Sequence, residues 1–358
     1  YRVGPESAGA NPGPSCYRRG GPLTVTDCNI LLGKIQPKYF PQVFGQNGNL
    51  PLDTKSVRSG FLNLADSIAG ATDTPLQSPE KVAEGYLHIA VENMANAIKK
   101  ISVQRGYDVT EYTLNCFGGA GGQHACLVAD ALGMKRVFLH PFAGVLSAYG
   151  MGLADIRALR EVQLEFPLNA ESTGRIENAC RPLIYEVKAE VIAQDIDDNL
   201  IKILRKAHLR YEGTDSALLV DVDIPEQMTR AFEHAHKQRF GFIARERGII
   251  VEALSVEAVG ATESIFDEIK PTASQPHPPM PHDTVQMFSK GQNRATPLYL
   301  RDNLLTGQKI TGPAIIAEQT GTVIVEEDWS AETNGQGHLI LTRYRERPDR
   351  YAIGTSAD

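Results

Sequence analysis

The most informative segment of this sequence reads Tyr112-Thr113-Leu114-Asn115-Cys116-Phe117, then Gly118-Gly119-Ala120-Gly121-Gly122. The first six residues have the aromatic and β-branched character of a strand. Apolar residues at helical spacing follow from about 123 to 132, and Gly133 closes that run. A second strand is expected at 136–139. Strand, glycine loop, helix and strand in this order predict a βαβ unit and therefore a parallel sheet.

Upstream of this unit, residues 78–106 predict one long helix. Ser78-Pro79-Glu80 is a strong helix start, and apolar residues at helical spacing continue to 101 before Gly106. Residues 1–22 are so rich in glycine and proline that we expect an ordered loop or a linker. Thr26 or Asp27 should then cap a short helix over 28–32.

Downstream of the unit, a helix with regularly spaced glycines is expected over 144–154, and the pattern of apolar and polar residues changes from about Arg157. The patterns predict strands at 161–168 and 250–259, helices at 176–204 and 227–240, a hairpin of 209–211 with 218–222, and final strands at 298–300, 314–317, 322–325 and 339–342. We expect an α/β lobe over 1–160 and an α+β, β-rich C-terminal domain over 161–358. A Pro-rich loop is expected near 274–282.

The amino-acid composition argues against some classes of protein function. The chain has 358 residues, 42% hydrophobic and 22% charged, with a net charge of −7. Acidic balance argues against a nucleic-acid binder, and no run approaches the ~18 apolar residues of a membrane span. Five widely spaced cysteines without ligand spacing predict reduced thiols and a cytoplasmic protein. A first residue Tyr1 rather than Met suggests part of a longer protein.

The glycines at 118–122 carry two interpretations. Backbone N–H groups in such a loop can approach an anion or nucleotide, and the following helix dipole attracts negative charge. The same loop can be only a tight turn. It is neither a GxGxxG nor a Walker A motif, so a P-loop enzyme is not expected.

Two side chains beside these loops are candidate catalytic groups. His124, at the first turn of the expected helix, could be a general acid or base, or could only tie down the glycine loop. Asp27 could be a catalytic base or a Mg²⁺ ligand, or could only cap a helix. His234 and His236 lie two apart on a helix and make a poor metal pair. The sequence leaves the metal unknown.

Longer motifs carry a resemblance to a known family. They are Gly4-Pro5-Glu6-Ser7-Ala8-Gly9-Ala10, Pro12-Gly13-Pro14-Ser15-Cys16-Tyr17, Gly20-Gly21-Pro22-Leu23-Thr24-Val25-Thr26-Asp27 and Phe117-Gly118-Gly119-Ala120-Gly121-Gly122-Gln123-His124-Ala125. Together they resemble the hydantoinase A/oxoprolinase family, and weaker matches at 144–155, 209–213 and 312–316 extend the resemblance over essentially the whole chain. The Gly-Gly-Gln-His form is similar to ATP-dependent 5-oxoprolinases. Hydantoinase and ketone-carboxylase relatives more often show Gly-Pro-Leu-His.

The resemblance implies an actin-like ATPase core, in which two RNase H-like lobes clamp ATP and Mg²⁺. Residues 118–122 would form the adenosine-side loop of the second lobe, so the first 160 residues would be that lobe. The family's Asp-x-Gly-Gly-Thr phosphate motif is absent from this sequence. The chain should therefore hold one wall of the ATP site, and its partner would be a hydantoinase B-like domain or subunit; a homo-oligomer is also possible.

The implied reaction is ATP-driven opening of the 5-oxoproline lactam to glutamate through a phosphorylated intermediate. A hydantoinase, an ATP-dependent ketone carboxylase subunit and a non-catalytic scaffold are the alternatives. We expect the isolated chain to be inactive, and Asp27 and His124 to face one cleft with at least one of them catalytic. Gly119→Val is expected to abolish nucleotide binding and leave the fold largely intact.

Overall fold

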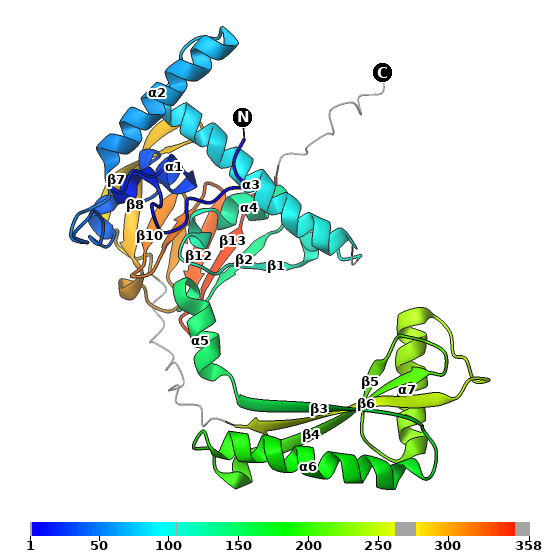
Figure 1. The fold of residues 1–358 in the computed structure, drawn as a ribbon. Coiled ribbons are helices and arrows are strands. Elements are labelled where there is room, and N and C mark those ends of the chain that lie inside the picture. Colours follow the sequence, from blue (N-terminus) through cyan, green and yellow to red (C-terminus); the bar gives the residue numbers. More distant parts are fainter. Residues whose placement is uncertain (1, 105, 262–276, 348–358) are drawn as a thin grey trace. The chain divides into compact units, whose positions relative to one another are not determined.

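The computed structural model describes residues 2–104, 106–261 and 277–347, which divide into two compact units. The first unit draws on residues 1–149 and 267–358, and the second on residues 150–266. Figure 1 follows the chain through both units from blue to red. The C-terminal strands therefore return to the unit in which the chain begins.

The first unit mixes helices and strands. Its helices are α1 (Val25–Leu31), α2 (Thr54–Thr72), α3 (Pro79–Gln104), α4 (Ala125–Leu132) and α5 (Leu146–Leu153), the last of which runs into the second unit. Its strands are β1 (Thr113–Asn115), β2 (Arg136–Leu139), β7 (Asp283–Ser289), β8 (Gln292–Leu300), β9 (Lys309–Thr311), β10 (Ala314–Ala317), β11 (Thr322–Val325), β12 (Trp329–Thr333) and β13 (Leu339–Arg343).

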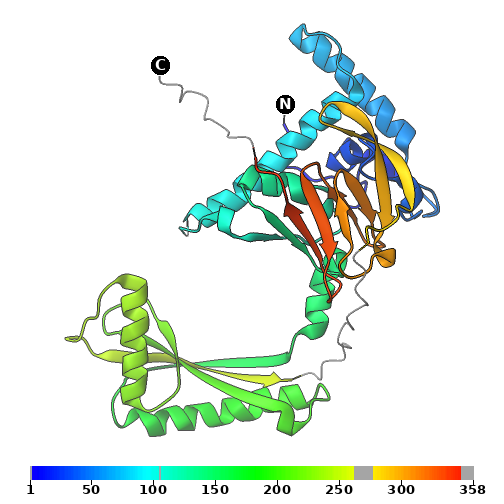
Figure 2. The ribbon, with the colours of Figure 1, turned by 180° about the vertical axis from the view of Figure 1, so that it is seen from behind.

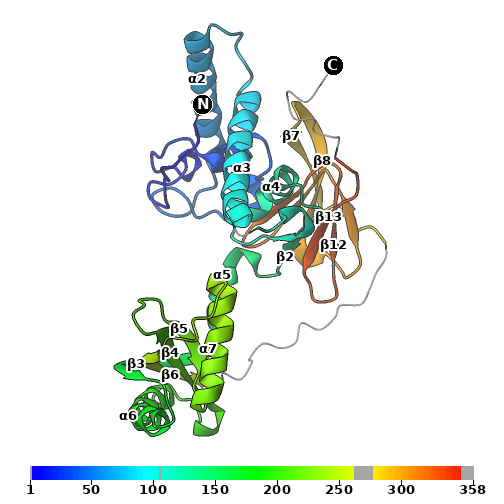
Figure 3. The same ribbon diagram turned by 90° about the vertical axis from the view of Figure 1, so that its right-hand side faces the viewer.

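A five-stranded sheet in the order β1-β2-β13-β12-β9 organises this unit. β1 and β2 are parallel, with Leu114 opposite Val137, and α4 connects them, so the predicted βαβ unit is confirmed. Figure 3 shows α4 between α3 and the strands. The buried faces of both helices and of the sheet, including the fully buried Trp329, form one apolar core.

Two further layers complete the first unit. A four-stranded sheet has the order β11-β10-β8-β7, with β8 and β10 parallel and the other pairs antiparallel. Helices α1, α2 and α3 bury a separate apolar cluster with the N-terminal segment, to which Cys16 and Phe61 contribute. The glycine- and proline-rich N-terminus is thus anchored in a packed core through Cys16, while most of residues 2–12 are exposed.

The second unit is a four-stranded antiparallel sheet in the order β3-β6-β4-β5. Its elements are β3 (Ile156–Pro167), α6 (Ser172–Ile192), β4 (Ile201–Tyr211), β5 (Leu218–Asp221), α7 (Pro225–Phe240) and β6 (Ile249–Gly260). Figure 2 shows α6 lying along this sheet. The apolar sides of α6, α7 and the strands form its core, so the unit has a hydrophobic interior of its own.

The structure corrects the predicted domain layout. Residues 161–358 were expected to form one C-terminal domain, but only the stretch up to 266 belongs to the second unit, and β7 to β13 pack in the first. The physical reason is strand pairing across the chain, since β13 adds to β2 with Leu341 opposite Val137. Of the Pro-rich loop near 274–282, residues 274–276 lie outside the described residues, and 277–282 contain no helix or strand.

Two element boundaries also differ from prediction. The helix expected over 28–32 is α1, which begins at Val25 with Thr24 as its N-cap, so Asp27 sits one turn inside it. The helix expected over 176–204 ends at Ile192, because residues from Ile201 alternate apolar and polar and pair with β6. Helix α2 and strands β7, β9 and β12 were not predicted.

Two global expectations can be compared with the structure. All five cysteines are free, in agreement with the spacing, and all five are buried, which the spacing did not predict. Among the described residues, no helix has the length and apolarity needed to cross a bilayer.

Candidate functional site

The glycine loop follows β1 at the carboxyl end of the parallel strands. Its first residues, 118–120, are exposed, whereas Gly122 is buried. The Gly118 N–H donates to the carbonyl of Ala143 (2.8 Å), which ties the loop to the segment after β2. Phe117 and Phe142 beside this join are 56% and 44% exposed, so two aromatic faces border an open stretch of backbone.

Most of these glycines are explained by close packing. A Cβ atom would lie 2.9 Å from the carbonyl oxygen of Thr320 at Gly119, and 2.7 Å from that of Thr322 at Gly122. Contacts this short with backbone force the structure to shift, which weighs against the expectation that Gly119→Val leaves the fold largely intact. That expectation stays a prediction. Gly118, with φ +91°, has open space around its would-be Cβ and is required by its backbone conformation.

Charged side chains that the sequence did not reveal gather after β8 and β10 of the four-stranded sheet, whose β10–β11 turn packs against the glycine loop. Arg301, after β8, donates to the carbonyl of Gly337 (2.6 Å) and lies 3.7 Å from Glu318, after β10. Burial raises the pKa of Glu318 and lowers the pKa of Arg301. One terminal nitrogen of Arg301 is buried without a partner in the described part of the chain. The strand order brings these residues together, and no local signal marks them.

His124 is the N-cap of α4 and is only 7% exposed. Its Nε2 lies 3.4 Å from Asn29 Nδ2, and the same Asn29 amide donates to Gln123 Oε1 (2.7 Å). His124 Nδ1 and Asn29 Oδ1 are buried without a partner among the described residues. Burial, followed by the nearby Lys34 charge, lowers the pKa of His124 to about 4, so the ring is neutral at physiological pH.

Asp27 is fully buried and acts as a hub for backbone N–H groups. Its carboxylate accepts hydrogen bonds from the N–H groups of Ser15 (3.2 Å), Cys16 (2.9 Å) and Thr24 (2.8 Å), and from the Thr24 hydroxyl (3.0 Å). It thereby closes a capping box and fastens the N-terminal loop to α1. Four donors occupy both oxygens, so in this conformation Asp27 organises the chain.

The structure places Asp27 and His124 on neighbouring elements without contact between them. Asp27 faces residues 15–16, whereas Asn29, two positions along α1, faces His124. Residues two apart on a helix point to different sides, which explains the separation. That the two side chains share a cleft, and that one is catalytic, therefore stays a prediction. Asn29 and Gln123 were not singled out from the sequence.

A buried ion pair lies near this cluster. Lys34 Nζ is 2.5 Å from Glu326 Oε1, and the two side chains are 3% and 7% exposed. Cys126 on α4 donates its thiol to the carbonyl of Ile324 (3.4 Å), and burial raises its pKa well above the usual value. The pair joins residues 292 positions apart, which is why no sequence pattern reveals it.

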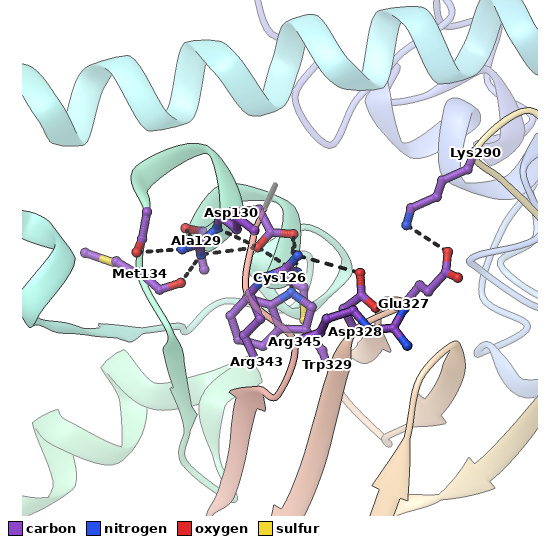
Figure 4. Close-up of polar contacts among 12 residues, drawn as sticks. Cys126, Ala129, Asp130, Met134, Lys290, Glu327, Asp328, Trp329, Arg343 and Arg345 are labelled. Carbon is purple, nitrogen blue, oxygen red and sulfur yellow. Dashed lines mark hydrogen bonds and ion pairs between the residues drawn. The ribbon is translucent and has the colours of Figure 1, made fainter. Parts of the chain in front are cut away.

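The far end of α4 is clamped to the sheet by arginines (Figure 4). Asp130 lies 3.2 Å from both Arg343 and Arg347 and accepts a hydrogen bond from the indole of Trp329 (3.3 Å). Arg347 also donates to the carbonyl of Ala129 in the last turn of α4 and to the carbonyls of Gly133 and Met134 just after the helix. A guanidinium at a helix C-terminus is favourable, so α4 is held at both ends.

A cavity of about 550 Å³ lies beneath the N-terminal segment. It is bounded by residues 2–9 and 22–28 together with Phe61 and Leu64 of α2 and Tyr86 of α3. Asp27 does not line the cavity; its hydrogen bonds with Cys16 and Thr24 fasten the lining segment 22–28 to the loop at 15–16. The volume of the cavity is within the range of small-molecule sites, ~300–1,000 Å³.

Among the residues that the structure describes, neither ATP nor a metal has a complete set of partners. The exposed backbone of 118–120 and the aromatic faces beside it fit one side of a nucleotide. No group of three or more His, Cys, Asp or Glu side chains suited to a metal occurs within 2–104, 106–261 and 277–347. Mg²⁺ usually takes most of its ligands from water and substrate phosphates, so this does not conflict with the expected ion.

Two regions of the sequence, which together cover most of the chain, match one protein family. The sequence pattern of "Hydantoinase/oxoprolinase" matches residues 1–160, and that of the "Hydantoinase/oxoprolinase C-terminal domain" matches residues 168–343. The chain belongs to the hydantoinase/oxoprolinase family. It is 36% identical to the 5-oxoprolinase of Dictyostelium discoideum over 335 residues, covering 92% of this chain and 26% of that protein. It thus spans about a quarter of the relative's length.

Solved structures share the fold. A nucleotide-free acetone carboxylase matches 96% of this chain and 49% of its own with a TM-score of 0.83 and 20% identity. The ATP-dependent caprolactamase of Pseudomonas jessenii matches 96% and 50%, with a TM-score of 0.67 and 25% identity. The expected mixed α/β fold class is confirmed by these matches.

Proposed function

We propose that the intact protein carrying this chain opens the lactam ring of 5-oxoproline to glutamate with ATP. The observation that carries the proposal is the 36% identity to a 5-oxoprolinase along 92% of the chain, together with the exposed glycine loop before α4. The chain would supply one wall of the ATP site. A hydantoinase B-like domain or subunit would complete the enzyme.

ATP would supply the activating phosphoryl group. The lactam oxygen attacks the γ-phosphorus, the bond to ADP breaks, and the ring carbon becomes electrophilic. Water then adds at that carbon, the C–N bond breaks, and the nitrogen takes up a proton, which leaves an acyl phosphate. A second water attacks its carbonyl carbon, the C–O bond to the phosphate breaks, and glutamate and phosphate are released. Mg²⁺ would neutralise the phosphates, and its protein ligands are not assigned.

The residues of this chain would have distinct tasks. Backbone at 118–120 and the faces of Phe117 and Phe142 would hold the nucleoside, because aromatic faces stack on bases. His124, neutral because of its low pKa, would accept or donate a single proton or keep the loop in place. Asp27 would hold the N-terminal loop against α1 through the four hydrogen bonds it accepts.

The alternatives are a hydantoinase, a ketone carboxylase subunit and a scaffold without turnover. Activity should be measured on the intact protein with ATP and, in turn, 5-oxoproline, hydantoin and acetone with bicarbonate. We expect ADP and glutamate only with 5-oxoproline. With an ¹⁸O-labelled lactam oxygen, phosphate released by C–O cleavage of the acyl phosphate should carry the label, and unlabelled phosphate would exclude this route.

The nucleotide wall can be tested at Ala120, which is exposed and has an ordinary backbone conformation (φ −95°). Ala120→Trp should weaken ATP binding about tenfold or more, because the new side chain covers the open backbone, and should leave the melting temperature unchanged. Ala71→Trp, at an exposed position of α2, is the matched control. Equal ATP affinities in both variants would show that the loop is only a packed turn.

A further inference from the structure

The lining of the cavity beneath the N-terminal segment combines two charged side chains with apolar ones. Arg2 is its single cationic and Glu6 its single anionic lining residue among those described. Neither side chain forms a hydrogen bond or ion pair within residues 2–104, 106–261 and 277–347, and both are exposed. The remaining lining includes the apolar side chains of Leu23, Val25 and Phe61, with Thr24 and Thr26 among them.

We propose that this cavity binds the carboxylate-bearing lactam itself, with Arg2 holding the carboxylate and Glu6 accepting the ring N–H. The proposal rests on the proposed function and names the place of its substrate. An arginine fork fits a carboxylate with two parallel hydrogen bonds. The ring methylenes of such a lactam would lie against the apolar side chains of the lining.

The walls of the cavity are built before any ligand binds. Asn93 of α3 donates to the carbonyl of Val3 (3.3 Å), and Gly13 N–H donates to the carbonyl of Ala8 (3.1 Å). Ser15 N–H donates to the carbonyl of Pro22 (2.9 Å), which joins the loop around residue 15 to the segment that begins at residue 22. Because the backbone is already fixed, binding would have to order only side chains, chiefly those of Arg2 and Glu6, which limits the entropy cost for a small ligand.

The charges exclude the other reactant from this cavity. ATP carries several negative charges, and one arginine beside a glutamate cannot offset them. A ligand with one carboxylate and one donor N–H matches the single cation and single anion. A lactam without a carboxylate, such as caprolactam, would leave Arg2 unused. The lining therefore favours 5-oxoproline over uncharged cyclic amides.

Three ligands separate the two contacts: 5-oxoproline, 2-pyrrolidinone, which lacks the carboxylate, and cyclopentanecarboxylate, which lacks the lactam. In the intact enzyme, Arg2→Gln should raise the KM for 5-oxoproline about tenfold with kcat nearly unchanged, as expected for lost uniform binding. It should raise the inhibition constant of cyclopentanecarboxylate and leave that of 2-pyrrolidinone unchanged. Glu6→Leu should give the reverse pattern for the two inhibitors.

Arg136→Gln, an exposed arginine on β2 that does not line the cavity, is the control. Saturation-transfer NMR on the 358-residue chain, with the same three ligands and variants, measures the cavity without turnover. If the unsubstituted enzyme does not open 5-oxoproline, the proposed function fails, while NMR binding that depends on Arg2 still supports the cavity. If Arg2→Gln and Arg136→Gln behave alike in both measurements, the cavity assignment is overturned.

Discussion

Two buried histidines, one in each unit, are equally hidden and differently surrounded. His124 in the first unit and His236 in the second are both 7% exposed. His236 Nδ1 donates to the carbonyl of Phe242 (2.9 Å), and aromatic rings of α7 and β4 enclose it. His124 has one long contact with Asn29 and a buried Nδ1 without a partner among the described residues.

The difference extends to the surroundings of each histidine. Every Asp, Glu or Lys that is buried in the described chain lies in the first unit, namely Asp27, Lys34 and Glu326. The buried polar residues of the second unit are Ser172, His236 and Ser255. Burying charge and leaving polar atoms unpaired costs free energy, so it persists where function or long-range ties require it. The comparison favours the first unit as the place of chemistry.

The largest effect should come from breaking the buried ion pair. Lys34→Met leaves Glu326 charged and unpaired, so unfolding of the first unit should become easier by about 3–5 kcal/mol. The double variant Lys34→Met/Glu326→Leu should recover much of this loss. Urea unfolding can be followed by the fluorescence of Trp329, the single tryptophan and fully buried in the first unit.

The matched pair in the second unit is Arg205 with Glu177, 2.6 Å apart and 33% and 50% exposed. Arg205→Met should cost about 1 kcal/mol or less, measured by hydrogen exchange in α6. Equal costs for Lys34→Met and Arg205→Met would remove the distinction between the units.

Asp27→Asn should cause the next largest loss in the free energy of unfolding. An amide cannot replace both carboxylate oxygens, and its NH₂ would face backbone N–H donors, so the loss should be about 3–4 kcal/mol. This revises the expectation from capping alone, in which Asn would serve nearly as well. Ser172→Ala in the second unit, where the hydroxyl accepts from Asn169 N–H (2.8 Å), should cost about 1 kcal/mol. An equally stable Asp27→Asn protein would contradict the role of Asp27 as a hub.

The smallest of the three effects is a pH dependence from His124. Its pKa falls from 6.5 to about 4 on folding, so the unfolded chain binds the proton more readily. Stability is complete above about pH 6.5 and is lost as the pH falls toward about 4, by at most about 3 kcal/mol. His124→Gln should remove this part of the dependence in Trp329-monitored unfolding. The exposed His234→Gln should not, and parallel curves for all three proteins would refute the assignment.

Local patterns predicted much of the fold. Propensity and periodicity located α3, α4, α7 and the parallel pair β1–β2, because these depend on residues within one turn or one strand. Strands β9 and β12 were missed, since each is short and becomes a strand only by pairing with distant partners. The helix expected to 204 failed because the pairing of β4 with β6 overrides helical propensity beyond 192.

By itself, the sequence determined the family, the glycine loop before α4 and the two candidate side chains, because motifs and helix starts are local. Only the tertiary structure decided that the C-terminal strands complete the first unit's sheet, and that Asp27 fastens the N-terminal loop to α1. It alone joined Lys34 to Glu326 and Arg301 to Glu318. Such contacts link residues far apart in the chain, and their free energy depends on burial, which exists only once the core has formed.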